Sequence, residues 1–148
     1  RILVAYADCG TGGALAEVCE RHGAEMIAGP HCYAFYEGLE RFAAHGGDEP
    51  GALYLTDFLV RQFESFIIAP LGLDRHPELR DDYFGNYRRL VHLAQEDDPA
   101  LEAAGRAAAA RLGLAYERRL TGYGDLATTL ARLAAPLAAP EAGGPQRT

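Results

Sequence analysis

Three short apolar runs in this chain each lead into side chains that could do chemistry, and a stretch with helical spacing follows each one. The chemically capable residues after these runs are Asp8, Cys9, His31, Cys32, Asp74, Arg75 and His76. If the runs are parallel strands, their carboxyl ends meet at one edge of a sheet, where open α/β sheets bind ligands. We therefore expect all seven side chains to share one site.

The thiols suggest the chemistry of this site. Cys9 and Cys32 each come just before a predicted helix, and a helix N-terminus lowers the pKa of a thiol. The thiolate is both a nucleophile and a metal ligand, and thiolates combined with imidazole suit zinc or iron. The leading hypothesis is a transition-metal site with Cys9 and Cys32 as first ligands and His31 or His76 completing the set.

A glycine-rich turn follows the first run, and its residues are suited to holding an anion. The residues of this turn are Gly10, Thr11, Gly12 and Gly13. Glycines let the backbone approach a ligand, and the next helix presents free N–H groups. Arg75 could clamp a carboxylate or phosphate, with Asp8 and Asp74 in support. The structural alternative is a tight turn, with Arg75 in a salt bridge to Asp74 or Asp8 and His76 as a helix cap.

Two further residues have simpler interpretations. Cys19 shares the apolar face of its predicted helix with Leu15 and Val18, so we expect it in the core. His92 falls within a predicted strand, and we interpret it as a packed histidine.

The periodicity of the chain predicts the elements that must position these residues. Strands are expected at 2–6, 26–29, 66–69, 90–94 and 114–120, and helices at 14–22, 33–45, 77–86, 99–112 and 125–134. A helix is also expected at 53–64; the alternative is a strand at 52–55 with Thr56 and Asp57 at its end. Alternating strands and helices predict an α/β fold: a single-domain, three-layer open sheet of at least four strands, mostly parallel, with helices on both faces.

The domain organisation is expected to be simple. Residues 1–135 form one α/β domain, and the Pro-, Gly- and Ala-rich tail at 136–148 is predicted to be disordered. Because the chain opens with Arg1 directly before a strand-like run, we expect that an N-terminal segment packing on the sheet is missing.

Composition excludes several classes of function. A net charge of -7 argues against a nucleic-acid surface, and no apolar run approaches the roughly 20 residues that span a bilayer. The chain has no lysine, which excludes a Schiff-base or P-loop lysine. Three cysteines do not form a disulfide framework, so reduced thiols and a cytoplasmic location are expected.

Several motifs occur in an order that resembles a known family. They are Asp8–Gly13, His31-Cys32-Tyr33, Leu55–Arg61, Gly72–Leu79, Tyr83–Tyr87 and Leu93-Ala94-Gln95. Together they resemble the bacterial and archaeal family called domain of unknown function 1638, over roughly Ile2 to Leu133. The resemblance implies sequence before the first strand and an acidic residue after the His-Cys-Tyr motif, where this chain has Ala34. It also implies a link to corrinoid-dependent one-carbon metabolism, with a corrinoid or methyl-transfer protein as partner.

Two alternative functions remain open. In a cofactor-free enzyme, Cys9 and Cys32 would exchange protons at a carbon beside a small carboxylate held by Arg75 and the glycine-rich turn. The Asp8–Gly13 segment resembles the Asp-Ser-Gly-x-Gly-Gly opening of glutamate racemases. Alternatively, the chain is a non-enzymatic partner protein whose loops bind a cofactor carrier or another subunit.

Overall fold

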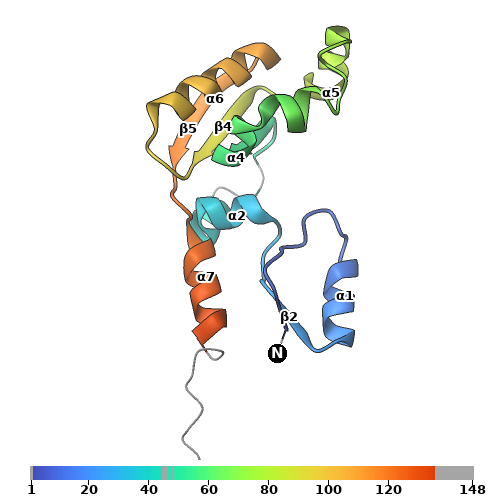
Figure 1. Cartoon of the computed structure of the whole chain (residues 1–148), viewed down its shortest axis with the longest axis vertical. Helices are drawn as coiled ribbons and strands as arrows, with labels where there is room; N and C mark the ends of the chain where they lie inside the picture. The colour runs from blue at the N-terminus through green and yellow to red at the C-terminus, as the bar shows by residue number, and fades with distance from the viewer. Residues whose placement is uncertain (1, 45–46, 48, 136–148) are drawn as a thin grey trace, which may run out of the picture.

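The computed structural model describes residues 2–44, 47 and 49–135, and the predicted tail lies outside these residues. Strands alternate with helices along the described chain, so the α/β class is confirmed (Figure 1). The first half contains β1 (Ile2–Val4), α1 (Ala14–Arg21), β2 (Ala24–Met26), α2 (Cys32–Glu37), α3 (Leu39–Ala44), β3 (Ala52–Thr56), α4 (Asp57–Arg61) and the π-helical segment η1 (Glu64–Ile68). The second half contains the 3₁₀ turn η2 (Pro77–Leu79), α5 (Arg80–Phe84), β4 (Arg89–Ala94), α6 (Pro99–Leu112), β5 (Ala115–Leu120) and α7 (Asp125–Ala134).

The described strands form two parallel sheets rather than one sheet of at least four strands. The smaller sheet pairs β1 with β2, and the larger has the order β3-β4-β5. Leu3 lies opposite Glu25 in the first, and Leu90 lies between Leu53 and Tyr116 in the second. Parallel neighbours need a crossover connection, which helical segments supply in each case.

Helices cover both faces of the larger sheet, as expected. Because successive strand residues point to opposite faces, Leu55 and Leu90 join the core beneath α4 and α6. Tyr54 and Val91 point the other way, into a core that includes aromatic side chains of α2. The central strand β4 is consequently buried from Leu90 to Ala94.

The smaller sheet has a core of its own. Ala7 and Ile27 pack there with Phe35 of α2 and Leu133 of α7. Cys19 on α1 is 5% exposed, which confirms its expected place in the interior. Within the ranges described, no helix combines the length and apolar character needed to cross a membrane.

Helix α2 lies between the two sheets (Figure 1). Its Phe35 belongs to the smaller core, whereas Tyr33 and Tyr36 pack against the core of the larger sheet. Two glycines allow the chain to close around this helix. A Cβ atom at Gly29 would lie 2.5 Å from the Phe35 ring, and one at Gly124 would meet the carbonyl oxygens of Phe35 and Tyr36.

A network of ion pairs also attaches α2 to the larger sheet. Glu37 is 6% exposed and accepts a 2.7 Å hydrogen bond from the guanidinium of Arg119 on β5. Arg119 also donates to Glu49 and Glu117, and Arg89 pairs with the same two carboxylates. The network therefore fixes the last residue of α2 to strands β4 and β5.

The strand predicted at 66–69 is wrong. Residues 64–68 form the π-helical segment η1, in which Phe66 is 56% exposed while Ile68 is 1% exposed. In a strand these two side chains would share a face, so their opposite environments require a helical spacing. Asp74, Arg75 and His76 therefore do not follow a strand, and the shared-edge argument does not hold for them.

Other boundaries also differ from prediction: β1 ends at Val4 rather than at residue 6, and the helix predicted at 77–86 is a 3₁₀ turn followed by α5, which ends at Phe84. The helix expected at 53–64 is instead strand β3 followed by α4, as in the alternative that placed Thr56 and Asp57 at a strand end. The helix expected at 33–45 divides at Gly38, whose φ of 96° is incompatible with a helix, and His45 lies outside the described residues. The second strand lies at Ala24–Met26 rather than 26–29.

A buried Asp–His pair joins the carboxyl end of β3 to β4. His92 is fully buried, and its Nε2 donates to Asp57 Oδ1 at 2.7 Å. The second Asp57 oxygen accepts the N–H groups of Gln95 and Glu96 at 3.0 and 2.9 Å. His92 Nδ1 in turn lies 2.9 Å from the hydroxyl of Tyr116. His92 is thus packed, as interpreted from sequence, but inside a polar network.

Asp57→Ala should lower the free energy of unfolding by about 3 kcal/mol or more, because it leaves the buried His92 without its acceptor and two partly buried backbone N–H groups unpaired. Asp74→Ala is the matched control: its partially exposed side chain pairs only loosely with Arg75, so about 0.5 kcal/mol or less is expected. Urea denaturation followed by circular dichroism measures both. Equal losses in the two variants would contradict this role for Asp57.

Candidate functional site

Cys9 and Cys32 both line a cleft of about 620 Å³, whose wall also contains His31 and Glu49. The same two cysteines line a smaller, mainly apolar cavity of about 290 Å³ together with Ile27. The two thiols therefore lie where the two cavities meet.

Parallel pairing of β1 and β2 brings these two cysteines together. Cys9 follows β1, and Cys32 begins α2 after β2, so both stand beyond the carboxyl ends of adjacent strands. The backbone N–H of Cys32 donates to Cys9 Sγ at 3.4 Å. All three cysteines are free thiols, and Cys19 is not part of either cavity wall.

Burial and charge both favour the protonated form of the Cys32 thiol. Burial raises its pKa most, and the negative charge and hydrogen bond of Cys9 raise it further. Backbone hydrogen bonds at Cys32 and Tyr33 lower this pKa, but they are outweighed. The expectation that a helix N-terminus would give Cys32 a lowered pKa is therefore wrong. Burial, with smaller contributions from both cysteines, raises the pKa of Tyr33 to about 12, so Tyr33 is a neutral phenol at neutral pH.

His31 stands beside the pair as the N-cap of α2. Its Nδ1 accepts the Ala34 N–H at 3.4 Å, which assigns this ring nitrogen to capping. The ring also packs edge-on against Tyr33 and Phe42, with centroids 5.7 and 5.1 Å away. These contacts hold His31 at the cleft wall with one nitrogen already engaged.

The glycine-rich turn is organised around a carboxylate of the chain itself. Asp8 accepts the Gly13 N–H at 3.1 Å and a hydrogen bond from the Thr11 hydroxyl. These two interactions lower the pKa of Asp8. Gly10, Gly12 and Gly13 have φ values of 77°, 59° and 88°, which the turn requires. The segment is therefore a tight structural turn, and the anion that it holds is the Asp8 carboxylate of the chain itself.

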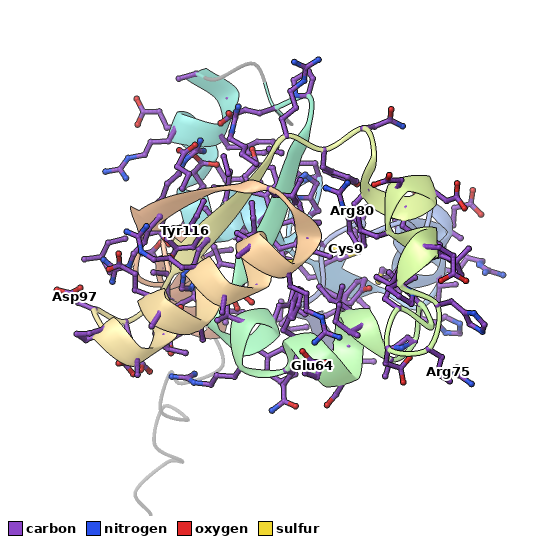
Figure 2. The ribbon with its side chains drawn as sticks, turned by 90° about the horizontal axis from the view of Figure 1, so that it is seen from above. Cys9, Glu64, Arg75, Arg80, Asp97 and Tyr116 are labelled. Carbon is purple, nitrogen blue, oxygen red and sulfur yellow. The ribbon has the colours of Figure 1, made fainter. Side chains whose placement is uncertain are left out.

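The third predicted cluster lies away from the cysteines. Arg75 pairs with Asp74 at 3.7 Å, and Figure 2 shows its side chain at the outer edge of the molecule. His76 Nδ1 lies 3.2 Å from Glu78, and both side chains are exposed. None of the three predicted residues is part of the cleft wall. The structure therefore brings Cys9, Cys32 and His31 together, and it does not add Asp74, Arg75 or His76 to them.

The arrangement of possible metal ligands is sparse. In the part of the chain that the structure describes, no three His, Cys, Asp or Glu side chains are grouped so that they could hold one metal ion. Cys9 and Cys32 are the two cysteines that line the same cleft.

Sequence reasoning missed the aromatic wall of the cleft. Tyr33 of α2 stacks on Tyr54 of β3, with ring centroids 5.7 Å apart and planes 28° from parallel, and Tyr87 lines the same cleft. The alternation of β3 was a signal for Tyr54, because it faces away from Leu53 and Leu55. No local pattern indicated that the three tyrosines meet.

The fold and the cleft define an α/β protein in which two cysteines line one cleft beyond the carboxyl end of a small parallel sheet. A family model described as "Protein of unknown function (DUF1638)" matches residues 1–130, so the chain belongs to this family. Comparison with curated proteins and with solved structures gives no match. The resemblance seen in the motifs is thus confirmed.

Cys9→Ser should lower the pKa of Cys32, because it removes the neighbouring charge that disfavours the Cys32 thiolate. More thiolate is then present at a given pH, so the midpoint of the pH–rate profile for alkylation of Cys32 should move to lower pH. The profile is measured with iodoacetamide and peptide mass spectrometry. Cys19→Ser should leave it unchanged. A midpoint that stays in place or rises in Cys9→Ser would contradict the conclusion that Cys9 raises the pKa of Cys32.

Proposed function

We propose that this protein binds a transition metal ion, zinc or iron, through the thiolates of Cys9 and Cys32, as an enzyme or an accessory factor. The observation that carries the proposal is the 3.4 Å contact between Cys9 Sγ and the backbone nitrogen of Cys32, in a cleft that both side chains line. Adjacent thiolates repel each other, and a bound cation removes that repulsion while replacing their protons.

Such a site would have open coordination positions. His76 pairs with Glu78 outside the cleft, and His31 uses Nδ1 for capping, so we assign neither as a main ligand. Structural zinc sites are closed by four protein ligands, whereas catalytic sites leave a position for substrate. A two-thiolate site in an open cleft therefore fits metal-dependent chemistry or metal transfer better than a structural role.

We also propose a metabolic role, a partner and a cellular compartment for this protein. The family resemblance supports a role in corrinoid-dependent one-carbon metabolism, with a corrinoid or methyl-transfer protein as the partner. Three free thiols fit the reducing conditions of the cytoplasm. A partner of this kind would complete the metal ligands from the open side of the cleft.

The two-cysteine acid–base enzyme is the second candidate, and one observation favours it. Burial and Cys9 keep a proton on Cys32, so the pair could contain one proton donor and one acceptor. However, Arg75 lies outside the cleft and the Gly13 N–H is already bound by Asp8. The proposed holders of a substrate carboxylate are therefore not in place, and we favour the metal site.

Cys9→Ser and Cys32→Ser should each weaken zinc binding by about 100-fold or more, because even loss of an outer-shell partner costs about 10–100-fold. Cys19→Ser and His76→Ala should bind zinc as the unchanged protein does, since Cys19 is buried on α1 and His76 pairs with Glu78. Competition with a chromophoric chelator, on protein purified anaerobically, gives the affinities.

Two outcomes would contradict the metal proposal. One is an unchanged protein that fails to bind zinc or iron stoichiometrically. The other is a loss of affinity in Cys19→Ser as large as in Cys9→Ser. Either result would favour the acid–base or partner-protein functions.

A further inference from the structure

We propose that Cys9 and Cys32 are a site of reversible oxidation, at which a small-molecule disulfide converts the two thiols into one internal disulfide bond. The reaction goes beyond metal binding, because it needs only the two thiols. Its regulatory consequence rests on the proposed function: the disulfide would use both proposed metal ligands and so would exclude the metal. The observations behind it are the contact between the two residues and their access to solvent.

Cys9 and Cys32 are already in contact. Cys9 Sγ accepts the backbone N–H of Cys32 at 3.4 Å, although the two residues are 23 positions apart in the chain. Because this nitrogen is bonded to the Cys32 Cα atom, the Cys9 sulfur lies no more than about 4.9 Å from that Cα. In a disulfide, the sulfur of one cysteine is three bonds from the Cα of the other, which is close to this span. Bond formation therefore requires side-chain rotation and little movement of the backbone.

Access to solvent separates this pair from the third cysteine. Cys32 is exposed and Cys9 is partly exposed, and both line the cleft of about 620 Å³, so an oxidant can reach them. Cys19 is 5% exposed on α1 and lines neither of the two cavities. Because thiol oxidation follows accessibility, we expect Cys19 to stay a thiol under the same conditions.

The reaction consists of two thiol–disulfide exchanges, with glutathione disulfide as the oxidant. The thiolate of one cysteine first attacks a sulfur of glutathione disulfide, which forms a mixed disulfide and releases one glutathione thiolate. The thiolate of the other cysteine then attacks the protein sulfur of the mixed disulfide, which forms the Cys9–Cys32 bond and releases the second glutathione thiolate. Two electrons pass from the pair to glutathione disulfide, and the two thiol protons go through solvent to the released glutathione. An excess of reduced glutathione reverses both steps.

The folded structure predicts how strongly the internal disulfide is favoured over the mixed disulfide. In an unfolded chain, two groups joined by a flexible segment meet at an effective concentration of about millimolar. In the folded protein, the parallel pairing of β1 and β2 holds the two cysteines in contact, and groups held in this way react as if far more concentrated. We expect the ratio of internal to mixed disulfide to be about 10-fold higher in the folded protein than in urea.

The test compares three variants that each keep two cysteines: Cys19→Ser, Cys9→Ser and Cys32→Ser. Each metal-free, reduced protein is equilibrated with glutathione redox buffers at mildly alkaline pH, with and without urea, then acidified and weighed by mass spectrometry. Cys19→Ser should lose two hydrogen atoms in mass, whereas Cys9→Ser and Cys32→Ser should gain glutathione instead. Circular dichroism checks that each variant is folded. A peptide map of the unchanged protein, which needs no substitution, should find Cys9 linked to Cys32.

Three results would overturn the inference. One is a folded Cys19→Ser protein that gains glutathione or links two chains instead of closing its own disulfide. Another is an internal disulfide that is favoured no more in the folded protein than in urea. The third is a peptide map of the unchanged protein in which Cys19 is oxidised as readily as Cys9 and Cys32. Because all these samples are metal-free, none of these results depends on the metal proposal.

The regulatory consequence has a separate measurement. Zinc is titrated into reduced and oxidised Cys19→Ser protein in competition with a chromophoric chelator. We expect the reduced protein to bind zinc and the oxidised protein to fail to compete, because both proposed ligands are then in the disulfide. Equal zinc affinity of the two forms would overturn the regulatory consequence. A reduced protein that binds no zinc would contradict the metal proposal and would leave the oxidation site in place.

Discussion

The rest of the structure depends on one constraint: α2 must satisfy two cores at once. Phe35 fills the core of the smaller sheet, while Tyr33 and Tyr36 pack against the larger sheet. The buried ion pair of Glu37 with Arg119 closes the far end of the helix. A helix of six residues held in this way has little freedom to shift. Cys32, its first residue, is therefore fixed relative to both sheets, and Gly29 and Gly124 are required because the chain closes so tightly around it.

The chemistry of the site follows from this placement. Cys9 is set by β1 and Cys32 by α2, so the two thiols approach each other because β1 and β2 pair in parallel. Cys32 keeps an exposed surface, but the atoms packed around it partly desolvate its thiol, which together with Cys9 raises its pKa and favours the protonated form. A thiophilic cation is the natural competitor for that proton. The aromatic wall comes from the same helix, since Tyr33 directly follows Cys32 and stacks on Tyr54.

Sequence reasoning succeeded where a local pattern has one physical meaning. The strands around Leu90 and Tyr116 and the helix that begins at Pro99 were predicted from their periodicity. The structure adds that Asp98 caps the start of this helix and that Gly113 ends it in a left-handed conformation. The approach of Cys9 to Cys32 followed from the same logic. The error at 66–69 has an equally clear cause: a short apolar run fits a buried strand and a helix equally well, and only the exposed Phe66 separates them.

The features that no local pattern could indicate depend on distant partners. The tyrosines of the cleft come from α2, β3 and the segment before β4, and tertiary packing alone unites them. Asp57 and His92 are 35 residues apart, and the sequence placed Asp57 in a helix or at a strand end and His92 within a strand; only the register of β3 on β4 pairs them. Arg75 and His76 show the converse, because a chemically rich motif proved to be exposed ion pairs.

The most direct measurement of the central claim is the X-ray absorption spectrum of the zinc-loaded Cys19→Ser protein. A zinc ion held by Cys9 and Cys32 in an open cleft should show two sulfur neighbours at about 2.3 Å, with lighter nitrogen or oxygen atoms completing the shell. In Cys9→Ser, a single sulfur should remain. A shell without sulfur in the Cys19→Ser protein would contradict the account, and so would four sulfurs, which would mean that zinc links two chains rather than filling one cleft.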